Sequence, residues 1–169
     1  MFAAACANGQ KVVCVTATRG DAGENADESR WPEARLAANR EQELLASLAY
    51  LGDIEHIWLD YEDGTLRSAP ANEAIQKLTQ IMKQVKPDTI ITFGPDGLTG
   101  HSDHKVVCAW AQAAAHASGM HPTVLMVSES EENYQAYGKT LHEVGNIYFA
   151  VDKEPATIPR EKADLFFIL

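Results

Sequence analysis

Two histidines and an aspartate stand close together in the segment GHSDH, residues 100–104. His101 and His104 are three positions apart, and Asp103 lies between them. On a helix, side chains at positions i and i+3 share a face, so both imidazoles can point into one site. Neutral imidazole is the commonest metal ligand, and a neighbouring carboxylate can fix the tautomer of a histidine. The pattern indicates a small-molecule metal site, with a simple helix cap as the alternative.

These residues follow a loop of small and polar residues that comes directly after a β-branched run. Residues 89–93 read TIITF, and residues 94–100 contain three glycines, which let the backbone come close to a ligand. Two further polar loops, residues 19–30 and 61–68, also follow expected strands. In parallel sheets, ligands sit beyond the carboxyl ends of the strands. We therefore expect the three loops to lie along one rim.

Expected strands and helices alternate along the chain. The strands cover residues 11–18, 56–61, 89–94, 123–128 and 147–152. The helices cover residues 32–51, 71–86 and 105–119, and residues 1–8 form the later turns of another helix that stops at Gly9. This alternation predicts an α/β fold, a Rossmann-like and mostly parallel sheet with helices on both faces.

Composition excludes several classes of protein. A chain of 169 residues with 46% apolar content is expected to form one domain with one core. The net charge of −10 disfavours a nucleic-acid partner, because such partners need a broad positive surface. No apolar run approaches the roughly 18 residues needed to span a bilayer, so no membrane span is expected.

The three cysteines and the four other histidines form no recognisable metal or redox motif. The cysteines form no C-x-x-C pair, and we interpret them as free thiols in a reducing compartment, the cytoplasm. They are Cys6, Cys14 and Cys108. None of the other histidines has a second histidine within three positions, and they read as ordinary surface or partly buried residues. They are His56, His116, His121 and His142.

Four segments carry a resemblance to a known family. They read TATRGDAG, NREQELLASLAYLG, WLDYEDGTL and KPDTIITFGPDGLTGHSDHKVV. In this order and spacing they resemble the PIG-L/LmbE family of zinc-dependent de-N-acetylases, over about residues 1–127. The resemblance implies a single deacetylase domain over residues 1–169, which removes the N-acetyl group from an N-acetylglucosamine-type substrate. Its partner would be a small acetamido sugar and its cofactor Zn²⁺.

The resemblance also implies roles for five residues. His104 matches the family's histidine zinc ligand. His101 matches the histidine that acts on the leaving group or the developing oxyanion, with Asp103 as its orienting partner. Arg40 and Asp63 match positions that bind the sugar. Without the resemblance, Arg40 reads as a surface helix residue paired with a glutamate, and Asp63 as a turn former.

The chain departs from the family pattern at its start. The family's first strand ends in H-P-D-D-E, which supplies two zinc ligands and the general base, and this sequence has no such segment. Of three implied zinc ligands only His104 remains, and one imidazole cannot hold a catalytic zinc. We therefore expect a domain that is truncated at its N-terminus, and also at its C-terminus, and whose intact parent is the enzyme.

Other interpretations stay open. The chain could be a catalytically inactive fragment or a sugar-binding relative with the same fold. A nucleotide-binding domain is the lower alternative, because residues 138–140, GKT, match only the back half of a P-loop and Asn133 stands at the front glycine position. Strand edges exposed by a missing first strand would favour a homo-oligomer.

Overall fold

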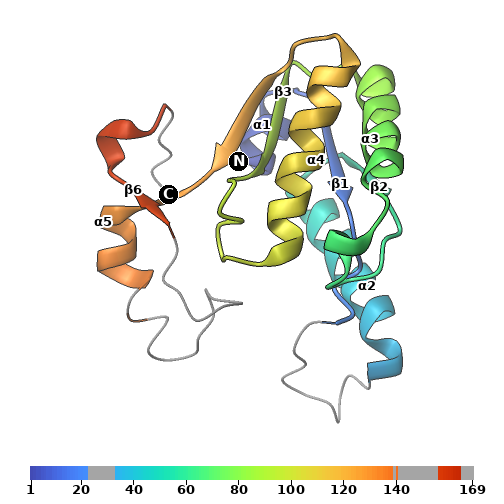
Figure 1. Ribbon diagram of the computed structural model, residues 1–169, viewed down its shortest axis with the longest axis horizontal. Coiled ribbons are helices and arrows are strands. Elements are labelled where there is room, and N and C mark those ends of the chain that lie inside the picture. Colours follow the sequence, from blue (N-terminus) through green and yellow to red (C-terminus); the bar gives the residue numbers. More distant parts are fainter. Residues whose placement is uncertain (23–32, 139, 141–155, 165–169) are drawn as a thin grey trace. The chain divides into compact units, whose positions relative to one another are not determined.

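The computed structural model describes residues 1–22, 33–138, 140 and 156–164 (Figure 1). The chain divides into two compact units, residues 1–70 and residues 71–169. The strand predicted over residues 147–152 lies outside the described residues. Two predictions concern the whole chain and stay predictions. One is that the chain forms a single domain, and the other is that the three polar loops lie along one rim.

The unit formed by residues 1–70 is built around two parallel strands. Its elements are α1 (Phe2–Ala7), β1 (Val12–Thr16), α2 (Glu33–Leu51), β2 (Ile54–Trp58) and the 3₁₀ turn η1 (Leu66–Ser68). β1 and β2 pair from Val12 opposite Ile54 to Thr16 opposite Trp58. Parallel neighbours need a crossover connection, which α2 provides while packing against β2. α1 contacts both β1 and α2.

The second unit repeats this arrangement. Its main elements are α3 (Ala71–Val85), β3 (Thr89–Phe93), α4 (Ser102–Ser118) and β4 (Thr123–Val127). β3 and β4 pair in parallel from Thr89 opposite Thr123 onward, and α4 connects them. α4 packs against α3, β3 and β4 (Figure 1). Short elements follow: β5 (Glu129–Ser130), α5 (Glu131–Asn133), the π turn η2 (Tyr134–Gly138), β6 (Thr157–Ile158) and η3 (Arg160–Lys162).

Apolar side chains at helical spacing form the core of each unit. In the first unit the buried leucines come from α2, the residue directly after β2, and η1: Leu36, Leu48, Leu59 and Leu66. In the second unit the largest contribution comes from α3 and α4, which pack against each other: Ala74, Leu78, Met82, Cys108, Trp110, Ala111, Ala114 and Ala115. Helix α2 is only partly covered, since Leu45 is 44% exposed.

The predicted α/β class is confirmed, because all three described strand pairs are parallel and alternate with helices. The largest differences from the expected boundaries are of three residues and occur at two places. Helix α4 begins at Ser102 instead of residue 105, because the side chain of His101 caps it. Strand β2 ends at Trp58 instead of residue 61, and Asp60 takes a left-handed backbone conformation with φ of 60°.

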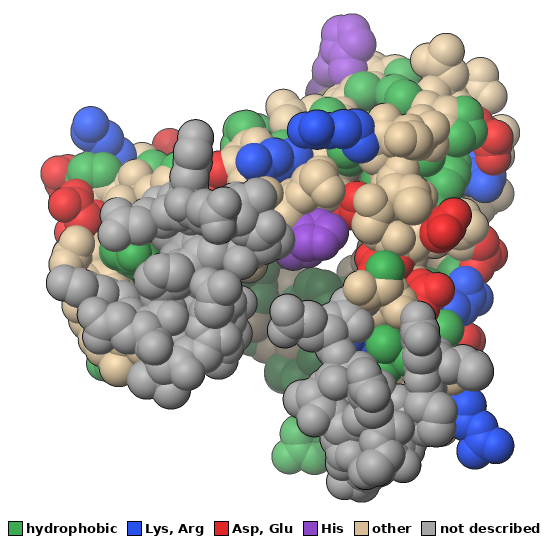
Figure 2. All heavy atoms as spheres, turned by 60° about the horizontal axis from the view of Figure 1, so that its bottom comes forward, with side chains coloured by type: hydrophobic (Ala, Val, Ile, Leu, Met, Phe, Trp, Pro, Cys, Tyr) green, Lys and Arg blue, Asp and Glu red, His purple; other side chains and the backbone are tan. Residues whose placement is uncertain are grey.

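Two surface properties bear on partners. No helix among the described residues is long and apolar enough to cross a membrane. On the face drawn in Figure 2, Lys and Arg side chains occur in small separate groups with Asp and Glu groups between them. The cytoplasmic location and the homo-oligomer stay predictions.

Candidate functional site

His101 is the N-cap residue of α4, and its imidazole ring caps the start of the helix. Its Nδ1 accepts a hydrogen bond from the backbone N–H of Asp103 at 3.1 Å. A nitrogen that accepts a hydrogen bond carries no proton, so neutral His101 carries its proton on Nε2. The ring can therefore donate a hydrogen bond only through Nε2.

His104 lies in the first turn of α4 and has the opposite tautomer. Its Nδ1 is 3.0 Å from the carbonyl oxygen of Gly97 and 3.2 Å from Oγ1 of Thr99. A carbonyl oxygen only accepts, so Nδ1 carries the proton and the lone pair lies on Nε2. Metal-binding imidazoles characteristically donate their second N–H in this way. The ring also stacks on Phe93, with centroids 3.9 Å apart and planes at 4°.

The structure brings the three predicted residues of the GHSDH segment together. The rings of His101 and His104 have centroids 5.0 Å apart. Asp103 is buried, with 4% of its surface exposed. Its hydrogen bond to His101 runs through its backbone N–H, so an orienting role for its carboxylate stays a prediction.

A zinc ion needs a larger set of ligands than this segment provides. Catalytic zinc sites use three protein ligands with an open position for water. Within the described parts of the chain, no group of three or more His, Cys, Asp or Glu residues could hold a metal ion. The tautomer of His104 fits one zinc ligand, but the described residues do not complete the site.

Asp63 connects two loops of the first unit. One carboxylate oxygen accepts from Oγ1 of Thr18 at 3.0 Å, and the other accepts from the backbone N–H of Ala22 at 3.1 Å. Thr18 and Ala22 belong to the loop after β1, whereas Asp63 follows β2. The alternative interpretation of Asp63 as a simple turn former is therefore incomplete, since its side chain holds the neighbouring loop.

Arg40 projects from α2 onto the same loop. Gly20 has φ of 70°, and a methyl group at its Cα would lie 2.7 Å from Nη1 and 3.3 Å from Cδ of Arg40. The arginine side chain thus packs directly on the glycine backbone. The two residues predicted to bind sugar, Arg40 and Asp63, both contact residues 18–22.

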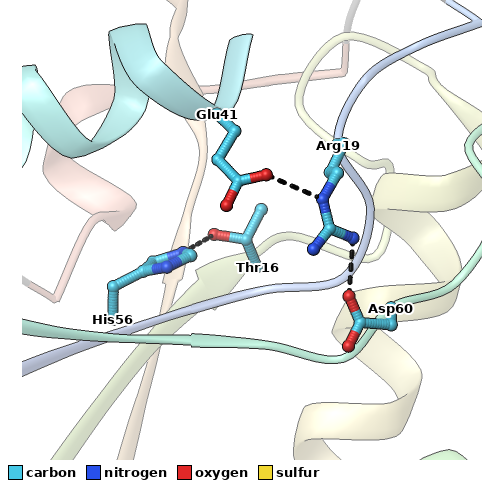
Figure 3. Close-up of polar contacts among 5 residues, drawn as sticks. All are labelled: Thr16, Arg19, Glu41, His56 and Asp60. Carbon is cyan, nitrogen blue, oxygen red and sulfur yellow. Dashed lines mark hydrogen bonds and ion pairs between the residues drawn. The ribbon is translucent and has the colours of Figure 1, made fainter. Parts of the chain in front are cut away.

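Sequence reasoning missed the residue at the centre of this region, Arg19. Its Nε donates to Oε2 of Glu41 at 3.1 Å, and its Nη1 donates to Oδ1 of Asp60 at 2.5 Å (Figure 3). Its guanidinium carbon lies 4.6 Å from the ring centroid of Trp58, within cation–π range. The hydrogen bonds to Asp60 and then Glu41 raise the pKa of Arg19. The only signal in the sequence was a charged residue directly after an expected strand.

His56 was interpreted as an ordinary histidine, but it belongs to the same polar cluster. Its Nε2 is 2.8 Å from Oγ1 of Thr16 (Figure 3). Its ring meets that of Trp58 edge-on, with centroids 4.4 Å apart. Burial lowers the pKa of His56; the charge of Glu41 opposes this shift and that of Arg19 adds to it. Thr16 lies on β1 and His56 on β2. Sequence reasoning did not find this pair, because the contact depends on how the two strands align.

Comparison with protein families identifies the class. The family described as PIG-L, GlcNAc-PI de-N-acetylase, matches residues 1–115. The chain belongs to this family, which confirms the resemblance carried by its four segments.

A curated relative agrees with this assignment. A 1D-myo-inositol 2-acetamido-2-deoxy-alpha-D-glucopyranoside deacetylase from Catenulispora acidiphila is 34% identical over 134 residues. The match covers 67% of this chain and 44% of the relative. The chain spans less than half the length of the first curated relatives that it matches.

Two solved structures share the fold. The N,N'-diacetylchitobiose deacetylase from Pyrococcus horikoshii has a TM-score of 0.63 at 19% identity, covering 87% of this chain and 70% of its own. The 4-carboxy-2-hydroxymuconate hydratase from Pseudomonas putida KT2440 has a TM-score of 0.58 at 22% identity, covering 75% and 54%. Because a deacetylase and a hydratase both have this fold, the fold alone does not select the reaction.

Proposed function

We propose that the protein acts in the removal of an N-acetyl group from an N-acetylglucosamine-type sugar by amide hydrolysis. The observation that carries the proposal is the pair of opposite tautomers in the first turn of α4. One imidazole, His101, offers an N–H donor, and the other, His104, offers a lone pair. Membership of the de-N-acetylase family supports the same reaction class.

In this proposal His101 acts on the amide. Hydrolysis places negative charge on the acetamide oxygen as the tetrahedral intermediate forms. A preorganised N–H donor stabilises that charge more than it stabilises the starting amide. Nε2 of His101 is the donor, because Nδ1 is engaged at the helix cap.

In this proposal His104 is the zinc ligand among the residues that the structure describes. A bound Zn²⁺ would supply a Lewis acid for the amide carbonyl and would lower the pKa of a coordinated water to about 7. His104 would supply one ligand through Nε2, with Gly97 holding the ring by its carbonyl oxygen.

The sugar contacts are assigned to the loop after β1 and its neighbours. Arg40 presents a guanidinium with several donors, which suits sugar hydroxyl oxygens. Asp63 holds the loop with both oxygens, and a carboxylate has about four acceptor sites, so it retains capacity for a sugar hydroxyl. The relative's name makes an acetamido glucoside of myo-inositol the first substrate to assay, with free N-acetylglucosamine second.

Zinc content and acetate release together test the proposal. The purified protein and its His104→Ala variant are dialysed and analysed for zinc, and acetate release is followed with both sugars. Stoichiometric zinc that disappears in the variant, together with acetate release, supports the de-N-acetylase. Sugar binding without zinc or acetate release supports the alternative, a sugar-binding relative. If the protein neither binds the two sugars nor releases acetate from them, the de-N-acetylase and the sugar-binding relative are both refuted.

A further inference from the structure

Arg19 and Gly20 face two consecutive residues of α2. Arg19 contacts Glu41 through a hydrogen-bonded ion pair, and the next residue along the loop, Gly20, lies against Arg40. The loop and the helix therefore meet in two adjacent contacts. Consecutive loop residues, 19 and 20, contact consecutive helix residues, 41 and 40. We therefore expect a change in the distance between Arg19 and Glu41 to change how Arg40 lies on Gly20.

The contacts of Arg19 are suited to fixing this meeting point. Its guanidinium uses Nε for Glu41 on α2, Nη1 for Asp60 after β2, and its face for Trp58 on β2. Arg19 and Glu41 are 31% and 35% exposed, so solvent screens their attraction only in part. Asp60 is 64% exposed, and its contact is more strongly screened in spite of its shorter distance. Glu41 is the partner that ties the loop to α2, because Asp60 lies after β2 instead.

Lysine cannot replace this set of contacts. An ammonium group is a compact charge without a planar fork, so it cannot reach two carboxylates on different elements while stacking on an indole. Alternative support for the loop comes from Asp63, which holds Thr18 and Ala22 on either side of Arg19. The loop should therefore stay folded when Arg19 is replaced, and only the part that faces α2 should shift.

We propose that Arg19 is a positioning residue, which holds the guanidinium of Arg40 against Gly20 in the geometry that binds the sugar. The link to sugar binding rests on the proposed function of Arg40, whereas the link between Arg19 and Arg40 rests on the contacts alone. The residue acts through Arg40 and needs no contact with the sugar itself.

The test compares Arg19→Lys with Arg35→Lys, a control on the exposed side of the same helix. In the full chain, ¹⁵N NMR follows the side-chain Nε–H signal of Arg40 and the backbone amide of Gly20. Titration with N-acetylglucosamine measures sugar affinity. We expect Arg19→Lys to shift both signals and to weaken sugar binding by about 10- to 100-fold, as the loss of a hydrogen bond from a charged group does. Arg35→Lys should leave the signals and the affinity unchanged.

Each result decides a separate link. Unchanged Arg40 and Gly20 signals in Arg19→Lys would overturn the positioning role, whether or not the protein binds sugar. Shifted signals with unchanged sugar affinity would overturn the link to sugar binding, and Arg40→Ala then shows whether Arg40 contacts sugar at all. If the unaltered protein binds neither N-acetylglucosamine nor the acetamido glucoside of myo-inositol, the proposed function fails, while the NMR signals still decide whether Arg19 positions Arg40.

Discussion

The guanidinium of Arg40 lies on the backbone of Gly20, so closely that a Cβ at residue 20 would be 2.7 Å from Nη1. An alanine at position 20 would therefore disturb two features, the left-handed φ of 70° and the placement of the Arg40 side chain. Gly9 has nearly the same φ, 72°, with no heavy atom within 4 Å of the corresponding position. Substitution of Gly9 therefore tests backbone strain alone, whereas substitution of Gly20 tests strain together with the contact to Arg40.

Gly20→Ala and Gly9→Ala should both destabilise the protein, but only the first should weaken sugar binding. A non-glycine residue in the left-handed region costs about 1–2 kcal/mol, so urea denaturation should show similar losses of unfolding free energy. Titration with N-acetylglucosamine should show weaker binding for Gly20→Ala alone. Equal sugar affinity in the two variants would contradict a role for the contact between Arg40 and Gly20.

Asp63→Asn should loosen the loop after β1. The amide keeps one acceptor oxygen, so either the Thr18 hydroxyl or the Ala22 N–H loses its carboxylate partner. Hydrogen bonds to charged groups contribute about 1.5–3 kcal/mol, and we expect a loss of unfolding free energy near the lower end because the site is partly exposed. The neighbouring and exposed Glu62 provides the control Glu62→Gln, and a loss as large as that of Asp63→Asn would refute the assignment.

Two substitutions of His101 should separate its capping from its catalytic role. Asparagine is a good N-cap, so His101→Asn should keep the stability of α4, whereas His101→Ala should lose about 1 kcal/mol. Both variants lack the Nε2–H donor and should reduce kcat by about 100- to 1000-fold, with little change in KM. The measurements are urea denaturation and steady-state kinetics of acetate release. Full turnover in His101→Asn would remove His101 from the reaction.

His56 should make stability depend on pH. Because burial lowers its pKa in the folded protein below 6.5, the unfolded chain binds the extra proton more readily between the two values. The stabilisation from neutral His56 is fully present above pH 6.5 and is lost as the pH falls towards the folded pKa. His56→Gln can still hydrogen-bond Thr16 but does not titrate.

Urea denaturation at about pH 8 and about pH 5 checks this expectation, because this range covers the charge change of histidine. The unaltered protein should lose more unfolding free energy on acidification than His56→Gln. Equal losses in the two proteins would mean that His56 keeps an ordinary pKa in the folded state.

The regular elements could be predicted because they depend on local patterns. Apolar spacing located α3, whose Leu78 and Met82 are buried, and the glycine at position 9 marked the end of α1 with its positive φ. The start of α4 was missed by three residues, because histidine is not among the usual N-cap residues and only its ring geometry reveals the cap.

The sequence by itself determined the α/β class, the family segments and the grouping of His101, Asp103 and His104, since residues within one helical turn are brought together by local geometry. Only the tertiary structure revealed that Arg19 joins α2 to the end of β2 and that Arg40 lies on Gly20. Those contacts join residues about twenty or forty positions apart, and their partners depend on strand register and helix packing. Long-range pairing of this kind leaves no period in the sequence, because any of several nearby carboxylates could have met the same guanidinium.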